Sequence, residues 1–405
     1  MGFKYQPIGN SDLRLLIPVS IESNRLSFSM SSFAQKSAPR YTAVSYTWGK
    51  GTPSEHIYIN GQRFPVRLNL WSCLHCLAQD KTAGWTHLWV DAICIDQTTN
   101  EERTAQVRRM DTIYRNASAV SVWLGLPPSV EQDQSRHEPM RTFEDPGGVD
   151  FYDQMSHLAN HPYWTRFWVI QEFLLGQDVN VYCGNTRMNW LHFKNTLGSC
   201  AGVPSDIHQA SMPKDFDSRP WRAFPLITGR HPDRHPEMHL PLFQLLINHS
   251  TSECEDLRDR VFALLGLVMP DERVLLERFF PDYDMSQDDV VLIALAHVRQ
   301  YNLEYDGVDD DILFKGLGIT DAKKRNMLER RVVYYDYLGD QVPRQYRFSD
   351  DDDYHRFPDD DNAVEMEARF SEGDDGPNHS CMKTAYAVTL FVLALLFLGV
   401  WKRYR

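Results

Sequence analysis

The sequence predicts an α/β fold with a mostly parallel central sheet and flanking helices. Three short apolar segments, at residues 41–46, 88–95 and 119–124, have the length and composition of strands. Two segments at residues 69–77 and 101–116 carry apolar side chains at helical spacing and separate these strands. Strands that alternate with helices at this rhythm indicate crossover connections, which are typical of a parallel sheet.

Two further strand features lie on either side of the first of these segments. Residues 15–21 form an apolar run in which Pro18 cannot donate to a ladder, so we expect an edge strand. Residues 57–66 place short β-type triplets around Asn60 and Gly61, the strongest short hairpin signal in the chain.

From residue 163 onward the chain is predicted to be mostly helical and then acidic. Helical patterns occur at residues 163–175, 242–247, 261–268 and 288–301. Blocks of aspartate from residue 309 onward indicate a solvated, flexible segment. We therefore expect an α/β core at 1–200, a mostly helical extension at 201–305 and an acidic flexible linker at 306–383.

The uncharged segment Thr384–Trp401 predicts one transmembrane helix at the end of the chain. Its 18 residues would span roughly 27 Å as a helix, close to the roughly 30 Å hydrocarbon core of a bilayer. Because no signal peptide is visible, we expect a tail anchor with the N-terminal domain in the cytosol, in the mitochondrial outer membrane or the endoplasmic reticulum. The basic residues 402–405 then lie on the translocated side, against the positive-inside rule.

Composition excludes several classes of function. The 405-residue chain has a formal net charge of −13, which disfavours binding to phosphates, so we expect no nucleic-acid partner. Seven scattered cysteines indicate buried thiols in a reducing compartment rather than a disulfide framework. Cys73, His75 and Cys76 lie close together, but no further paired ligands follow, so we expect helical packing and no metal site. Glycine-rich phosphate-binding motifs are missing, and no cofactor is expected.

Three ordered blocks of the sequence resemble the fungal heterokaryon-incompatibility (HET) domain. They are YTAVSYTWG at 41–49, LWVDAICIDQ at 88–97, and a block from Glu102 to Gly125 that ends in VWLG. FWVIQE at 167–172 and RDRVFALLGL at 258–267 are similar to the family's continuation, so the resemblance covers about residues 15–270. It implies a signalling protein in fungal non-self recognition, whose activation leads to regulated cell death. No repeat array or nucleotide-binding module is present to receive a signal, so we expect a separate activating protein or the acidic region 270–380, and a homo-oligomer as the active form.

The block at 167–172 is also similar to the helix of TIR domains in which a glutamate cleaves NAD at its nicotinamide bond. The strand that ends in Ser45-Tyr46 is likewise similar to the first TIR strand, and the two similarities together imply a TIR/flavodoxin-like core and a catalytic role for Glu172. The alternative function is a TIR-like NAD hydrolase activated by clustering, with NAD as substrate rather than cofactor. The chain departs from TIR domains at Val169, where they have cysteine, and it lacks their RDxxPG motif. Without a catalytic role, Glu172 would lie on the polar edge of an amphipathic helix.

Asp91, Asp96 and Gln97 are the candidate ligand-binding residues of the second block. The run that contains Asp91 is otherwise apolar, which predicts a strand buried on both faces. A buried carboxylate needs a partner, so Asp91 either pairs with Arg103 or Arg108 or lines a cleft. Asp96 and Gln97 lie at the carboxyl end of that strand, where open α/β sheets bind ligands. The alternative is loop and cap chemistry ahead of the next helix.

The first block and the TIR-like block supply the remaining candidates. Ser45, Trp48 and Gly49 lie at the carboxyl end of the first strand, so a ligand pocket is expected there if the sheet is doubly wound. Trp48 either stacks on a base or nicotinamide ring or fills the core. Trp168 lies beside Glu172 in the TIR-like block, and the resemblance makes it a further ligand-binding candidate.

Overall fold

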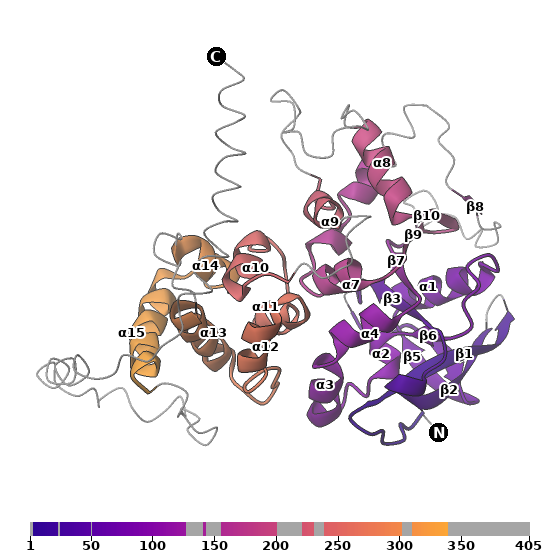
Figure 1. Ribbon diagram of the computed structural model, residues 1–405. Helices are drawn as coiled ribbons and strands as arrows, with labels where there is room; N and C mark the ends of the chain where they lie inside the picture. Colours follow the sequence, from indigo (N-terminus) through magenta and orange to yellow (C-terminus); the bar gives the residue numbers. More distant parts are fainter. Residues whose placement is uncertain are drawn as a thin grey trace, which may run out of the picture. The chain divides into compact units, whose positions relative to one another are not determined.

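Ten strands form one mixed sheet among the residues that the structure describes, which are 3–22, 25–49, 51–126, 141–142, 155–200, 221–230, 239–301 and 310–338 (Figure 1). In chain order, the strands of this computed structural model are β1 (Asp12–Glu22), β2 (Arg25–Ala34), β3 (Thr42–Tyr46), β4 (Glu55–Ile59), β5 (Gln62–Val66), β6 (Leu88–Trp89), β7 (Ala119–Trp123), β8 (Arg141–Thr142), β9 (Val179–Cys183) and β10 (Thr186–Asn189). Across the sheet their order is β5-β4-β2-β1-β6-β3-β7-β9-β10-β8.

The centre of the sheet is parallel, whereas its flanks are mixed. β6, β3, β7 and β9 pair in parallel, with Thr42 of β3 opposite both Leu88 of β6 and Ala119 of β7. β1 pairs antiparallel with β2 and with β6, and β4–β5 and β9–β10 are antiparallel hairpins. A mixed sheet therefore replaces the mostly parallel one predicted. The reason is that short turns, which join antiparallel neighbours, connect β1 to β2, β4 to β5 and β9 to β10.

β1 lies inside the sheet, so the prediction of an edge strand at residues 15–21 is wrong. The strand meets β6 only through Leu16 and Leu88, and its register with β2 shifts between Pro18 and Ser20. Proline is tolerated in this interior strand because few ladder hydrogen bonds are required on the β6 side and the ladder is irregular beside it.

The β4–β5 hairpin confirms the prediction for residues 57–66. Ile59 is paired with Gln62, and the two residues between them are Asn60 and Gly61. Their φ angles are 52° and 77°, and a type I′ turn requires positive values at both positions. Asparagine and glycine adopt this left-handed conformation at little cost, which is why the dipeptide identifies the turn.

The apolar run at 88–95 forms a strand only at its beginning. β6 ends at Trp89, and the short helix α2 (Asp91–Cys94) begins at Asp91. The Oδ1 atom of Asp91 accepts a hydrogen bond from the backbone N of Ala92 at 2.7 Å, and a carboxylate in the first turn of a helix is favoured by the helix dipole. The predicted strand is therefore wrong beyond Trp89.

Helices and 3₁₀ turns make up the rest of the described chain. They are η1 (Gln35–Ser37), α1 (Leu68–Gln79), α2, α3 (Asn100–Val107), α4 (Met110–Asn116), η2 (Pro162–Thr165), α7 (Val169–Leu175), α8 (Trp190–Cys200), α9 (Phe224–Gly229), α10 (Leu242–Asn248), α11 (Asp259–Phe262), η3 (Leu265–Leu267), α12 (Pro270–Leu276), α13 (Gln287–Tyr301), α14 (Asp310–Gly316) and α15 (Ala322–Leu338). The single helices predicted at 101–116, 163–175 and 261–268 are each interrupted. In the second of these, η2 and α7 are separated by a turn that proves to be central to the site.

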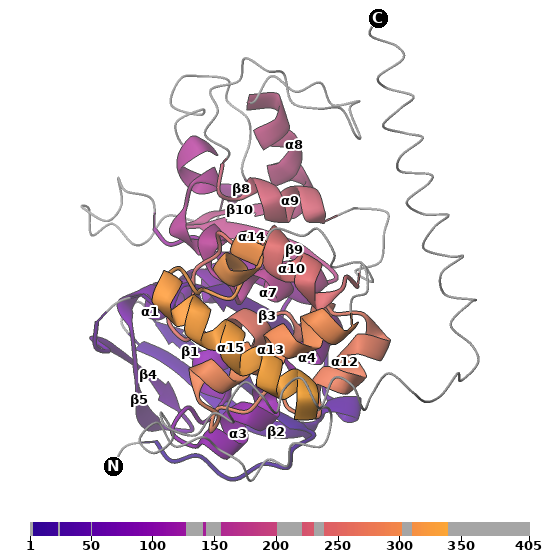
Figure 2. The same ribbon diagram turned by 90° about the vertical axis from the view of Figure 1, so that its left-hand side faces the viewer.

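The helices from α10 onward pack on one another through buried apolar side chains. α13 lies beside α15, and α10 lies beside α14 (Figure 2). α14 and α15 occupy residues 310–338 of the range 306–383 that composition assigns to a linker, and the remainder of that range lies outside the described residues. Residues Met1–Asp340 form one compact unit, and the second unit, Gln341–Arg405, also lies outside them.

The predicted transmembrane helix is not found in the part of the chain that the structure describes. None of the helices there is both long and apolar enough to cross a bilayer. α15 has 17 residues, and lysine, arginine and glutamate occupy much of its first ten positions. Residues 384–401, to which the sequence assigns the anchor, lie outside the described residues. This finding contradicts the predicted fold class in its transmembrane part, and it contradicts the predicted single-pass membrane localisation.

Candidate functional site

The candidate site is a buried group of polar side chains between β3 and α7. Ser45, on β3, is fully buried, and Glu172, on α7, is 2% exposed. The hydroxyl of Ser45 donates a hydrogen bond to the Oε2 atom of Glu172 and lies 2.6 Å from the hydroxyl oxygen of Tyr163. These three residues form what we call the buried trio. The sequence motifs point to Ser45 and Glu172 but not to Tyr163, which follows Pro162 at the start of η2.

The carboxyl group of Glu172 is tuned by its surroundings. Burial raises its pKa to about 7, and the negative charge of Asp91 acts in the same direction. The Arg166 guanidinium and hydrogen bonds from Ser45 and Tyr114 act in the opposite direction. A carboxyl group with a pKa near neutral pH can both accept and donate a proton, which is the property required of a general acid or base.

Arg166 links the buried trio to the partly exposed side of the site. It lies in the turn between η2 and α7, is half-buried, and donates from Nη1 to the carbonyl oxygen of Tyr46. Its positive charge favours the ionised forms of both Glu172 and Asp91. Arg166 is therefore the cation that compensates two carboxylates in one place, and no sequence motif indicated it.

Trp48 and Asp91 are brought together beside this turn. The Nε1 atom of Trp48 donates to Oδ2 of Asp91 at 2.8 Å, and burial raises the pKa of Asp91. Neither arginine proposed as its partner fills that role. The guanidinium of Arg103 lies over the ring of Tyr283, and Arg108 donates to a backbone carbonyl. The indole and Arg166 take their place, because α2 turns Asp91 toward β3.

Asp96 and Gln97 shape the loop that follows α2. The Nε2 atom of Gln97 donates to the backbone oxygen of Asp91 at 3.1 Å. The Oδ1 atom of Asp96 accepts hydrogen bonds from the backbone N and the hydroxyl of Thr98, at 3.0 Å and 2.6 Å. Loop and cap chemistry, the alternative considered for these two residues, accounts for both sets of contacts.

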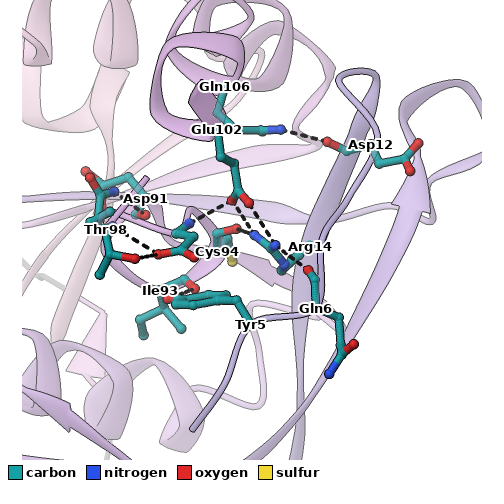
Figure 3. A network of polar contacts seen from close by, with 12 residues as sticks. Tyr5, Gln6, Asp12, Arg14, Asp91, Ile93, Cys94, Thr98, Glu102 and Gln106 are labelled. Atoms are coloured by element: carbon teal, nitrogen blue, oxygen red, sulfur yellow. Dashed lines mark hydrogen bonds and ion pairs between the residues drawn. The ribbon is translucent and has the colours of Figure 1, made fainter. Parts of the chain in front are cut away.

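A buried arginine holds this loop against the N-terminal strand, as Figure 3 shows. Arg14 is 2% exposed, and its Nη2 atom donates to Glu102 at 3.0 Å and to the carbonyl oxygen of Gln6 at 2.7 Å. Glu102 also accepts from the backbone N of Asp96 at 2.7 Å, and Arg14 donates to the carbonyl oxygen of Cys94. Arg14 and Glu102 therefore neutralise each other's charge and also provide hydrogen-bond partners for the backbone at Cys94 and Asp96. No local pattern marks Arg14, because its charged partner Glu102 lies 88 residues away.

A cavity of about 290 Å³ lies beside this network, and the N-terminal segment 5–10 lines part of it. Arg14, Asp96, Glu101 and Glu102 line it, whereas Ser45 and Glu172 do not. Asp96 is thus separated from the buried trio. The structure divides the predicted ligand-binding residues between two places.

The last two sequence candidates, Trp168 and Gly49, have identifiable structural roles. Trp168 is the N-cap residue of α7, and its indole hydrogen-bonds the carboxylate of Asp259 on α11. Gly49 is exposed and has a φ of 75°, which a glycine adopts without strain as the chain leaves β3. No atom lies within 4 Å of the place that a Cβ would occupy, so the positive φ of the turn, and not a lack of space, accounts for glycine at this position.

Metal ligation has no basis in the described residues, where no group of three or more His, Cys, Asp or Glu side chains could hold an ion. Cys73 and Cys76 are buried on α1, and the His75 ring stacks on Trp71 with centroids 5.0 Å apart. This arrangement agrees with helical packing of the CxHC segment.

Arg230 fixes the C-terminal end of the helix that carries Glu172. Its Nη1 atom donates to the carbonyl oxygens of Phe173 and Leu174 at 2.7 Å and 3.2 Å. Its Nη2 atom donates to those of Gly176 and Gln177 at 2.6 Å and 3.0 Å. The carbonyl groups at the end of a helix lack partners within it, and this one side chain satisfies two of them together with the carbonyls of two residues that follow the helix.

Comparison with known proteins identifies the domain that contains the buried trio. Residues 41–172 match the family described as heterokaryon incompatibility protein (HET). The chain carries a HET domain. Ser45 lies near the start of the matched HET domain and Glu172 is its last residue, so the hydrogen bond between them joins its two ends.

The wider chain is similar to a protein whose own name contains the term heterokaryon incompatibility. It is 25% identical over 354 residues, or 70% of its length, to heterokaryon incompatibility protein 6, OR allele, of Neurospora crassa. The chain spans about half, 51%, of the length of that relative. No solved structure matches the chain.

Proposed function

We propose that this HET-domain protein is a heterokaryon-incompatibility-type signalling protein that acts in non-self recognition and regulated cell death. The similarity to the Neurospora protein supports this role, and so does the match of residues 41–172. The observation that carries the proposal is the closed state of the HET domain, in which its two ends meet at the buried Ser45–Glu172 hydrogen bond. A protein that triggers death must be silent at rest, and a closed domain meets this requirement.

The proposed activator is a separate protein, and the proposed active form is a homo-oligomer. A ligand or partner that favours an open state shifts the population toward it by its difference in affinity for the two states. In the described HET domain the hydroxyls of Ser45 and Tyr163 and the positive charge of Arg166 surround the carboxyl group of Glu172. We propose that a partner which changes the packing at this place disrupts the arrangement.

Inducible expression of the full chain in a filamentous fungus tests this role. We expect loss of viability in hyphae that make the wild-type chain after fusion with strains of different incompatibility genotype. Ser45→Ala removes the hydroxyl between the two ends of the HET domain and should change the threshold for death, because it alters the closed state. Gln62→Ala, at an exposed position of β5, is the matched control and should behave as wild type. Survival of every fusion despite accumulation of folded wild-type chain would contradict the proposal.

NAD cleavage is the second candidate function, and the environment of Glu172 favours it. A carboxylate can stabilise the oxocarbenium-like state that forms when the N-glycosidic bond to nicotinamide breaks and water adds to the ribose. Glu172 has the raised pKa and the hydroxyl neighbours of an acid–base group. Because it is 2% exposed at rest, this activity would require an opened form such as a clustered one.

Release of nicotinamide by the full chain, fused to an inducible oligomeriser, tests the enzymatic candidate. We expect nicotinamide to form only after clustering, and Glu172→Gln to lower the rate by about 100-fold or more, as for loss of a general acid–base group. Glu101→Gln, at an exposed carboxylate, is the control and should retain the rate. Clustered wild-type chain that leaves NAD intact would exclude the enzyme and leave the signalling role standing.

A further inference from the structure

Residues 252–260, which we call the 252–260 segment, pair with the turn that leads into α7. The backbone N of Phe167 donates to the carbonyl oxygen of Glu253 at 2.9 Å, and the backbone N of Glu253 donates to that of Thr165 at 2.5 Å. Arg166 and Glu253 form an isolated parallel bridge. Two main-chain hydrogen bonds therefore hold this turn against a segment from the second half of the chain.

Arg260 fastens the same turn from the other end of the 252–260 segment. Its guanidinium carbon lies 5.2 Å from the centroid of the Phe167 ring. Its Nη2 atom donates to the carbonyl oxygen of Ser252 at 2.8 Å, and Nη1 donates to that of Gly316, on α14, at 2.9 Å. A single cation thus ties the turn, the segment and a C-terminal helix together.

Asp259 makes the second side-chain connection. It accepts a hydrogen bond from the indole of Trp168, the N-cap residue of α7, and another from the hydroxyl of Tyr283 at 2.7 Å. The guanidinium of Arg103, on α3, lies 4.1 Å from the centroid of the Tyr283 ring. The start of α7 is therefore connected through Asp259 and Tyr283 to Arg103 on α3.

The turn held in this way forms one wall of the buried trio. Arg166 belongs to this turn, and its positive charge acts to lower the pKa of Glu172. Tyr163 lies in η2, just before the turn, and its hydroxyl oxygen is 2.6 Å from that of Ser45. The backbone N of Glu172 donates to the carbonyl oxygen of Trp168 at 3.3 Å, so the helix that carries the carboxylate starts from this turn. α7 has seven residues and no side-chain cap at its N-terminus, so its first turn depends on contacts from outside.

We propose that the 252–260 segment is an autoinhibitory latch: in place, it keeps Glu172 and Ser45 closed to solutes, and its release uncovers them. The latch consists of two main-chain hydrogen bonds, one cation–ring contact and one indole–carboxylate bond. Opening a contact set of this size costs much less than unfolding the unit. The role of this opening as the activating step rests on the proposed function, whereas the closure itself does not.

Hydrogen exchange of the full chain, with Arg260→Met as the test variant, measures the latch. We expect amides of residues 163–172 to exchange about tenfold faster or more, which corresponds to about 1.4 kcal/mol of lost protection. Amides of α4 and β3 should keep their wild-type rates. As a second readout, Ser45→Cys should be alkylated slowly alone and faster when combined with Arg260→Met.

Arg273→Met is the matched control, because it also deletes one arginine that joins the C-terminal helices to the HET domain. Arg273 pairs with Asp111 on α4 at 2.6 Å and with Glu277, away from the turn. This variant should accelerate exchange in α4 and α12 and leave residues 163–172 unchanged.

Two outcomes would overturn the latch. One is unchanged exchange of residues 163–172 in Arg260→Met, and the other is a uniform increase over the whole unit, which would give Arg260 a merely structural role. Exchange of the Arg260→Met protein that is faster only at residues 163–172 would support the latch. If hyphae that make this variant nevertheless survive fusion, the latch would stand and the proposed signalling role would be contradicted. The two proposals therefore fail in different experiments.

Discussion

Arg230→Met should lower the free energy of unfolding by about 3 kcal/mol or more, because it removes a buried cation and leaves several buried carbonyl groups without partners. Arg230 is 9% exposed, and burial lowers its pKa to about 10, so it remains charged at neutral pH. Four backbone carbonyls at the end of α7 accept from it. Methionine fills a comparable apolar volume against Trp190 and Phe173, so the lost hydrogen bonds dominate the change.

Chemical denaturation of the full chain measures this effect. Arg222→Met is the control from the same part of the chain, and because Arg222 is exposed it should change stability by less than about 0.5 kcal/mol. Arg230→Lys should fall between the two, since one ammonium group cannot reach four carbonyl oxygens in the same geometry. A loss below about 1 kcal/mol for Arg230→Met, within the range of one ordinary hydrogen bond, would show that the end of α7 finds other partners.

Glu172→Gln should make the protein more stable than wild type above neutral pH and should flatten its stability profile. Burial raises the pKa of Glu172 from 4.5 to about 7 in the folded protein, so between these pH values the folded state holds a proton that the unfolded state has released. The stability that the protonated carboxyl contributes is present below pH 4.5 and lost as pH rises to about 7. Glutamine does not titrate, so at pH 8 we expect a gain of up to about 3 kcal/mol over wild type.

Unfolding free energies at closely spaced pH values from 4 to 8 test this expectation, and Asp259→Asn supplies an internal comparison. Burial raises the pKa of Asp259 from 3.8 to about 6, so its replacement should flatten the profile only below about pH 6. The decline between pH 6 and 7 should persist in Asp259→Asn and vanish in Glu172→Gln. A Glu172→Gln variant that loses stability with rising pH as steeply as wild type would show that Glu172 is ionised in the closed domain.

The parts of the fold that could be predicted are those whose signal is local. Asn60-Gly61 determines its turn by the φ angles of two residues, and the strand at 119–124 is a self-contained apolar run. The prediction of one strand at 88–95 was wrong because a buried single helical turn and a buried strand are equally apolar over so few residues. Only the position of Asp91, at the start of a helix, distinguishes them.

Part of the candidate site could be chosen from the sequence, whereas Tyr163, Arg166 and the contacts among its members could not. Ser45, Trp48, Asp91 and Glu172 do lie together, as the resemblance and the positions of the strand ends indicated. Their partners could not be inferred, since Ser45 and Glu172 are 127 residues apart and the hydroxyl of Tyr163 is 118 residues from Ser45. Contacts over such separations are determined by how the whole sheet assembles, and no local pattern records them.

The order of strands in the sheet has a consequence for how the chain is made on the ribosome. β3 is synthesised early, yet Thr42 finds its neighbours only when Leu88 and Ala119 have emerged. At about 5–20 residues per second, β3 waits roughly 2 to 9 s for β6 and 4 to 15 s for β7. During that interval the apolar stretch YTAVSY is an unpaired edge on a nascent chain, the kind of segment that molecular chaperones bind. The strand that supplies Ser45 therefore needs protection before the HET domain can close.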